Sequence, residues 1–117
     1  MVLVDTSIWI DHLRKPDHIL VSFLDKGAVS THPLVIEELA CGSIKTRVEF
    51  LGLLEFLPSV AIATHDEVLA LIESDQLYFR GLGATDVHLI ASAKLTRTRI
   101  WSRDKALSRE ATRLGLS

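Results

Sequence analysis

The sequence predicts an α/β domain of three layers, in which helices cover both faces of a central, mostly parallel sheet. Two features of the 117 residues predict this class. Short runs rich in Val, Ile and Ala, typical of buried parallel strands, recur along the chain. Longer segments with apolar residues at helical spacing separate them, and this alternation is typical of α/β folds. The length and the lack of linkers or repeats indicate a single domain over residues 1–117.

Four short strands are expected in this sheet. They are placed at residues 1–4, 28–31, 60–63 and 99–102. The first strand is the apolar run Met1-Val-Leu-Val, which stops at the carboxylate of Asp5. A polar residue directly after a buried strand lies at the carboxyl edge of the sheet, where open α/β sheets bind their ligands.

Seven helices are expected between and after the strands. They are placed at residues 8–15, 19–24, 33–41, 43–56, 64–80, 85–95 and 105–114. Gly27 is predicted to cap the second helix, because glycine readily adopts the left-handed conformation found at such ends. Thr64 and Glu67 fit a capping box at the start of the fifth helix. Thr85 is predicted to cap the sixth helix, with Asp86 in its first turn.

Composition and charge limit the location and the partners. No apolar run reaches the roughly 18 residues of a membrane span, and no basic region opens a signal peptide. The single cysteine, Cys41, excludes a disulfide framework and a four-cysteine zinc site, so a cytoplasmic protein without membrane contact is expected. The net charge of −2 argues against broad binding to DNA but leaves room for a local basic groove. The mean hydropathy of +0.28 favours an apolar face that contacts a partner.

Four acidic residues occur near the ends of predicted elements, at Asp5, Glu38, Asp86 and Asp104. The carboxyl ends of neighbouring parallel strands lie within roughly 10 Å of one another, so these side chains can converge. Carboxylates packed that closely repel one another unless a cation lies among them, and a hard cation such as Mg²⁺ or Mn²⁺ prefers oxygen ligands. Taken singly, Asp86 and Asp104 are also explained as helix caps.

Four segments of the chain, in this order, resemble the PIN domain family of metal-dependent ribonucleases, and in particular the small VapC-type toxins of bacterial toxin–antitoxin pairs. The segments are Val4-Asp5-Thr6-Ser7, Glu38-Leu39-Ala40-Cys41-Gly42, Asp86-Val87-His88-Leu89-Ile90-Ala91-Ser92-Ala93 and Trp101-Ser102-Arg103-Asp104. Each segment is a weak signal by itself. Together they extend the resemblance over essentially the whole chain.

The resemblance implies roles for particular residues. The four acids correspond to the four acids with which the family holds one or two Mg²⁺ or Mn²⁺ ions. Glu37 competes with Glu38 for the second position, but Glu38 matches better, because the family pattern is Glu-Leu, two residues and a glycine. The hydroxyl positions that hold carboxylates or metal-bound water in the family are matched by Thr6, Ser7 and Ser102.

The resemblance also implies an activity and partners. In the family a metal-activated water attacks an RNA phosphodiester in line, and a cognate VapB-type antitoxin and a homodimer are expected. Apolar helix faces near residues 8–24 and 44–57 are the expected contact surfaces. The basic residues available to bind phosphates are Arg80, Lys94, Arg97, Arg103 and Lys105. The family has a further short strand after the last helix, which is expected to be vestigial or missing here, so the sheet has four or five strands.

Other classes of protein fit these residues less well. A phosphatase of the haloacid dehalogenase type needs a second Asp two residues after the first, where Ser7 stands. A receiver-like signalling domain needs a phospho-accepting Asp after the third strand, where Ala63 and Thr64 stand. Two alternatives stay open: a PIN-fold binding module without catalysis, and a DNA-directed or structure-specific nuclease of the wider superfamily.

Overall fold

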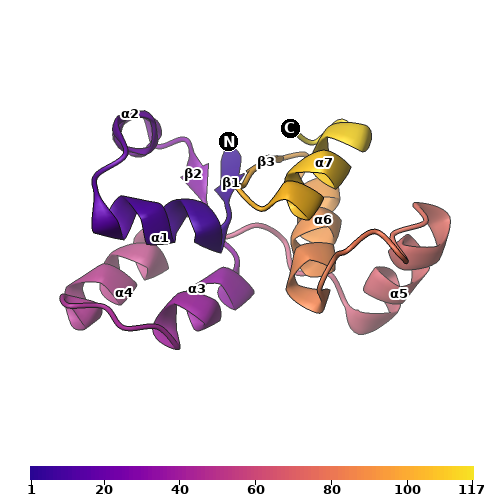
Figure 1. Ribbon diagram of the computed structural model, residues 1–117, viewed down its shortest axis with the longest axis horizontal. Coiled ribbons are helices and arrows are strands. Elements are labelled where there is room, and N and C mark those ends of the chain that lie inside the picture. Colours follow the sequence, from indigo (N-terminus) through magenta and orange to yellow (C-terminus); the bar gives the residue numbers. More distant parts are fainter.

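The computed structural model describes all 117 residues, in three strands and seven helices (Figure 1). Along the chain the elements are β1 (Val2–Val4), α1 (Thr6–Arg14), α2 (His18–Asp25), β2 (Val29–Ser30), α3 (Pro33–Ala40), α4 (Arg47–Phe56), α5 (His65–Ser74), α6 (Ala84–Thr96), β3 (Arg99–Trp101) and α7 (Lys105–Arg113). The strands form one parallel sheet in the order β2-β1-β3, so the first strand lies at its centre. The predicted α/β fold with a parallel sheet is confirmed.

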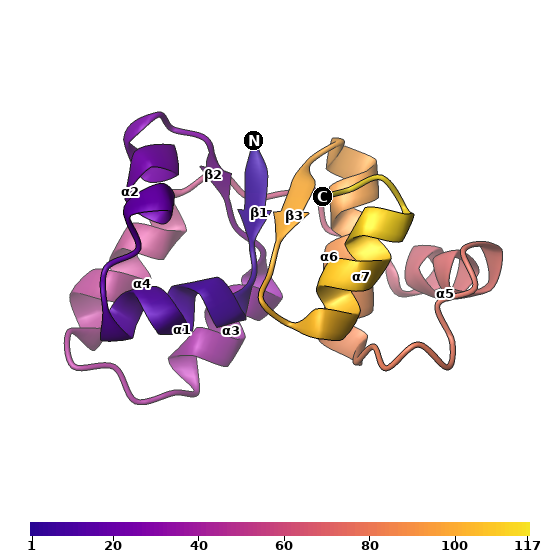
Figure 2. The same ribbon diagram turned by 45° about the horizontal axis from the view of Figure 1, so that its top comes forward.

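Helices lie on both sides of this sheet. In Figures 1 and 2 the helices α1 to α4 gather beside β2, whereas α6 and α7 lie beside β3 and α5 is outermost, against α6. The side chains of Leu3 and Val4 on β1, and of Leu89 and Ile90 on α6, are fully buried in the core between them. Burial from both sides explains why β1 is apolar at every position. No helix combines the length and the apolar character that crossing a membrane requires.

The prediction of four or five strands is wrong, because residues 60–63 form no strand. A single isolated bridge joins Thr31 to Ser59. In it, the Thr31 amide donates to the carbonyl of Pro58 at 2.8 Å, and the amide of Val60 donates to the Thr31 carbonyl at 3.0 Å. The chain therefore touches the edge of the sheet at one point only.

The bridge is not extended because β2 ends there. Pro33 starts α3 two residues after Thr31, and proline has no amide to donate to a neighbouring strand. The amide of Ala61 instead donates to the Thr96 hydroxyl at 2.9 Å. Val60 is nevertheless buried, so the apolar run that predicts a strand reflects burial and not pairing.

No fifth strand follows α7 in the structure. The carbonyl of Leu116 accepts one hydrogen bond from the Ile100 amide of β3, at 2.6 Å, but no further strand pairing follows.

Two of the three predicted helix caps are confirmed, Gly27 with a φ of +65° and the capping box of Thr64. The third is wrong: α6 begins one residue before Thr85, after an extended Gly83.

Glu110 on α7 is a buried carboxylate that the sequence pattern does not reveal. Only 1% of its side chain is exposed, and Arg109 and Arg113 donate to it through Nε at 2.9 and 2.6 Å. Burial by itself raises the pKa of Glu110, but these hydrogen bonds outweigh it and hold the pKa below its usual value. The two arginines also donate to the carbonyls of Arg80 and Asp75. The network therefore holds the loop that follows α5 against α7.

We predict that Glu110→Gln lowers the free energy of unfolding by about 2 kcal/mol at pH 7, because the arginines lose a buried anionic acceptor. Urea unfolding measures the change. Since the pKa of Glu110 is lower in the folded protein, its ionised form stabilises the fold above the usual pKa near 4.5. This contribution is lost as the pH falls, so the two proteins should converge in acid.

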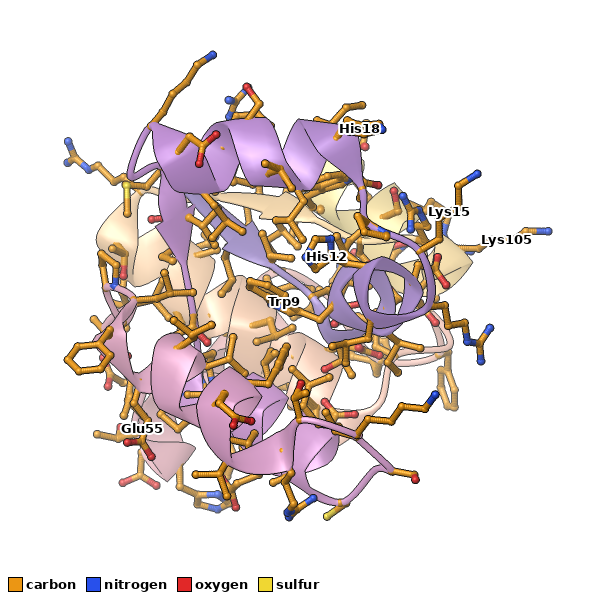
Figure 3. The ribbon with its side chains drawn as sticks, turned by 90° about the vertical axis from the view of Figure 1, so that its left-hand side faces the viewer. Trp9, His12, Lys15, His18, Glu55 and Lys105 are labelled. Atoms are coloured by element: carbon orange, nitrogen blue, oxygen red, sulfur yellow. The ribbon has the colours of Figure 1, made fainter.

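Glu55→Gln is the matched control, because Glu55 lies at the surface on α4 (Figure 3). Its unfolding free energy should stay within about 0.5 kcal/mol of the wild type. Equal losses from both substitutions would show that the buried arginine network does not stabilise the fold.

Candidate active site

Asp5 is the buried carboxylate at the end of β1, with 7% of its surface exposed. It is also the N-cap of α1, a position in which a carboxylate accepts from backbone amides of the first turn. Its Oδ2 atom accepts from the hydroxyls of Ser102 at 2.7 Å and Ser7 at 2.8 Å. The amide of Asp5 donates to the carbonyl of Trp101 at 3.0 Å. The pairing of β1 with β3 thus brings Ser102 to Asp5 from 97 residues away.

The same two serines hold the turn that carries Asp104. The hydroxyl of Ser7 accepts from the Arg103 amide at 2.9 Å, and that of Ser102 accepts from the Asp104 amide at 3.0 Å. Asp104 is the N-cap of α7, and its Oδ1 accepts from the amide of Leu107 at 2.9 Å. Two hydroxyls therefore connect the acid after β1 to the acid after β3.

Glu38 and Glu37 differ in their contacts. The carboxylate of Glu38 accepts from the Thr6 hydroxyl at 3.3 Å, so α3 and the start of α1 meet at this residue. Both residues are exposed, but the carboxylate of Glu37 accepts no hydrogen bond. Burial raises the pKa of Glu38, and although the Thr6 bond lowers it, the negative charges of Asp5 and Asp86 raise it further. The geometry therefore brings Glu38 toward the other acids.

Asp86 enters the cluster from α6. Its Oδ2 accepts from the Gly83 amide at 2.9 Å, which closes the first turn of the helix. Partial burial raises the pKa of Asp86; the Gly83 bond lowers it, and the charges of Asp104 and Asp5 raise it again. None of the four acids forms a salt bridge with a basic side chain. No basic side chain therefore offsets the repulsion among them.

The four carboxylates share one arrangement. Each uses one oxygen to accept from a protein donor, and its second oxygen accepts no hydrogen bond from the protein. No group of three or more Asp, Glu, His or Cys side chains is arranged closely enough to form a complete metal site. Mg²⁺ in proteins commonly binds to one or two carboxylates and keeps several of its water ligands. The unused carboxylate oxygens of these four acids are ligands of the type that Mg²⁺ prefers.

Several of the basic residues expected to bind phosphates already have acidic partners. Arg103 donates to Asp11 at 2.6 Å and to Asp17 at 2.7 Å, which ties the turn after β3 to α1 and α2. Lys94 pairs with Asp75 at 2.6 Å, and Arg80 belongs to the buried carboxylate network of α7. Of the predicted set, Arg97 and Lys105 are exposed and have no acidic partner.

His32 contributes to the site without having been predicted to do so. Its Nδ1 accepts from the Leu34 amide at 3.0 Å, so the imidazole is the N-cap of α3, the helix that carries Glu38. Burial, assisted by the nearby His88, lowers the pKa of His32 to about 4. A polar residue directly before Pro33 is the signal from which this cap was predictable. Cys41 is exposed at the end of the same helix.

Comparison with known proteins identifies the family. Residues 2–112 match the PIN domain family model. The chain belongs to the PIN domain family. It is 48% identical over 118 residues to Ribonuclease VapC32 of Mycobacterium tuberculosis, in strain CDC 1551 / Oshkosh and in strain ATCC 25618 / H37Rv, across 100% of this chain and 95% of each relative. The predicted resemblance to VapC-type PIN proteins is thereby confirmed.

We predict that Glu38→Gln raises the Tm of the metal-free protein at pH 7 by a small amount, on the order of 1 °C. Because the pKa of Glu38 is higher in the folded than in the unfolded protein, its ionisation destabilises the fold as the pH rises through 4.5 and above. The substitution removes that cost, so the two proteins should converge at a pH well below 4.5. Scanning calorimetry in the presence of a chelator measures the difference.

Glu37→Gln is the neighbouring control and should leave the Tm unchanged at pH 7, because the exposed Glu37 carboxylate accepts no hydrogen bond. A lower Tm for Glu38→Gln at pH 7 would mean that the bond from Thr6 outweighs the repulsion among the carboxylates.

Proposed function

We propose that this PIN domain protein is a divalent-metal-dependent endoribonuclease and acts as the toxin of a VapBC-type toxin–antitoxin pair. The observation that carries the proposal is the group of four carboxylates without a basic partner, on a chain 48% identical to a ribonuclease over its whole length. Such a group is electrostatically unfavourable by itself, and a bound cation removes the penalty.

In this proposal Asp5, Asp86, Asp104 and Glu38 hold Mg²⁺ or Mn²⁺. The bound ion supplies Lewis-acid chemistry, which polarises a phosphate oxygen and lowers the pKa of water. Ser102 and its partner Ser7 fix the Asp5 carboxylate so that its unused oxygen keeps one direction.

The backbone bonds of Asp86 and Asp104 restrict those side chains in the same manner. Thr6 holds Glu38 beside the other acids, where its unused oxygen orients the attacking water. These contacts reduce the reorganisation that the site needs when substrate binds, which favours catalysis.

The proposal includes a cytoplasmic location, a VapB-type antitoxin and a homodimer. Apolar side chains on α4 are strongly exposed, with Val48 at 84%, Leu53 at 68% and Phe56 at 89%. On α1 and α2, Ile10 and Ile19 are exposed at 40% and 62%. Exposed apolar helix faces of this kind are typical of protein–protein contacts, and both lie in the ranges predicted for the dimer and antitoxin surfaces.

We predict that Asp5→Asn lowers the rate of RNA cleavage in Mg²⁺ or Mn²⁺ by about 100-fold or more. A loss of this order is typical when a group that stabilises charge in an active site is removed. The reason is that asparagine keeps the size of the side chain and removes its charge. Cleavage of total cellular RNA, read by mapping new ends, measures the effect, and single-stranded DNA in parallel distinguishes the two substrates.

Asp25→Asn, at the exposed end of α2, is the control and should cleave as the wild type does. Millimolar Mg²⁺ should also raise the Tm of the wild type and of Asp25→Asn, but much less that of Asp5→Asn. Full cleavage by a folded Asp5→Asn protein would refute the assignment of this carboxylate.

We predict that light scattering at tens of micromolar gives a mass twice the 13.0 kDa of one chain. Phe56→Glu should shift the protein toward the monomer, because it places a charge on the exposed face of α4. Phe79→Glu, at a fully exposed phenylalanine between α5 and α6, is the control and should stay dimeric. A wild type that is monomeric at this concentration would exclude the dimer.

A further inference from the structure

A pocket of about 600 Å³ opens beside the acid cluster. It lies between the last turns of α1, the end of α3 and the connection from Gly42 to Thr46, and Glu38 forms part of its wall. Pockets of this size hold ligands of a few hundred daltons, which is the size class of one nucleotide. Any molecule bound in it therefore contacts a carboxylate of the proposed active site.

The lining combines apolar and cationic side chains. Ile10 and Leu13 of α1, about 40% exposed, line the pocket together with Ile44. Arg14 and Lys45 both line the pocket, one from α1 and one from the connection after α3. Apolar surface suits the faces of a nucleobase, and guanidinium and ammonium groups suit its phosphate.

Arg14 and Lys45 are available to a ligand, because both are exposed and neither forms a salt bridge or a hydrogen bond through its side chain. This distinguishes them from Arg103, whose guanidinium is already held by two aspartates. The connection that forms one wall of the pocket is stabilised by Arg47, which donates to the Gly42 carbonyl at 3.3 Å. Lys15 and Lys105 point outward on one side of the molecule (Figure 3) and have no acidic partner.

A phosphodiester strand that approaches four carboxylates needs positive charge next to them. Because Glu38 belongs both to the acid cluster and to the pocket wall, a phosphate next to the acids can meet two unpaired cations in this pocket. Phosphate contacts of this kind fix the register of a strand on a protein.

We propose that this pocket binds the nucleotide next to the scissile phosphate of single-stranded RNA. Arg14 and Lys45 bind its phosphate, and its base packs on Leu13 and Ile44. The inference rests on the proposed ribonuclease function and adds to it the two cations that position the strand.

Equilibrium binding without cleavage tests the pocket. The probe is a 5′-fluorescein-labelled RNA dodecamer of random sequence, and anisotropy is measured with the full chain in EDTA. The double variant Arg14→Ala/Lys45→Ala should bind about tenfold or more weakly at 50 mM salt. The slope of log K against log salt should fall in magnitude by about 0.7, because one phosphate contact is lost. Leu13→Ala should weaken binding severalfold and leave the slope unchanged.

Lys26→Ala/Arg99→Ala is the matched control. It removes the same charge from exposed positions at the opposite edge of the sheet, where β2 and β3 begin. This variant should keep the wild-type slope. If Arg14→Ala/Lys45→Ala binds the dodecamer with the affinity and slope of the control, the proposal is overturned, and the pocket is left to a protein partner.

A cleavage assay in Mg²⁺ or Mn²⁺ separates this inference from the proposed function. If the wild type binds RNA through the pocket but cleaves nothing, the ribonuclease proposal fails and the pocket stands. If the wild type cleaves and the double variant cleaves with unchanged KM, the pocket fails and the ribonuclease stands. The expected result is a raised KM with a smaller change in kcat, because the contacts are made away from the reacting atoms.

Discussion

The hydrogen bonds from Ser7 and Ser102 to the Asp5 carboxylate are the contacts on which the rest of the site depends. The bond from Ser7 is local, whereas the bond from Ser102 forms because β1 pairs with β3 and both strands end at the same edge of the sheet. Ser102 then holds the turn that leads to Asp104, and the start of α1 reaches Glu38 through Thr6. A buried carboxylate needs such donors, since an unpartnered buried charge is strongly unfavourable.

The three aspartates of the cluster also serve as helix-terminus residues. Asp5 and Asp104 are the N-caps of α1 and α7, and Asp86 accepts from the amide that precedes α6. The structural and the chemical explanations of these residues are therefore not alternatives. One oxygen of each carboxylate satisfies the helix, and the other stays available at the sheet edge. Partial burial, and then the charges of the neighbouring acids, raise the pKa values of Asp86 and Glu38, and perturbed pKa values are a common feature of functional sites.

The distribution of arginines divides the basic side chains into two groups. Arg109 and Arg113 surround the buried Glu110, and Arg103 connects α1, α2 and the turn after β3. These residues position backbone segments and are already satisfied. Arg14 and Lys45 line the pocket beside Glu38 without acidic partners, so two cations are available to a polyanion there despite the net charge of −2.

The sequence by itself determined the α/β class, the bounds of most helices and the four acids, because apolar periodicity and acids at element ends are local features. Only the tertiary structure decided that residues 60–63 form no strand and that the chain pairs there by a single bridge at Ser59, since the burial of Val60 and Ala63 leaves the same apolar pattern as a strand. It alone distinguished the contacts of Glu38 from those of Glu37, through a hydroxyl 32 residues away. It also decided which arginines are satisfied. Ion pairs between distant elements leave no periodic signal in a sequence, so these partners are known only once the chain has folded.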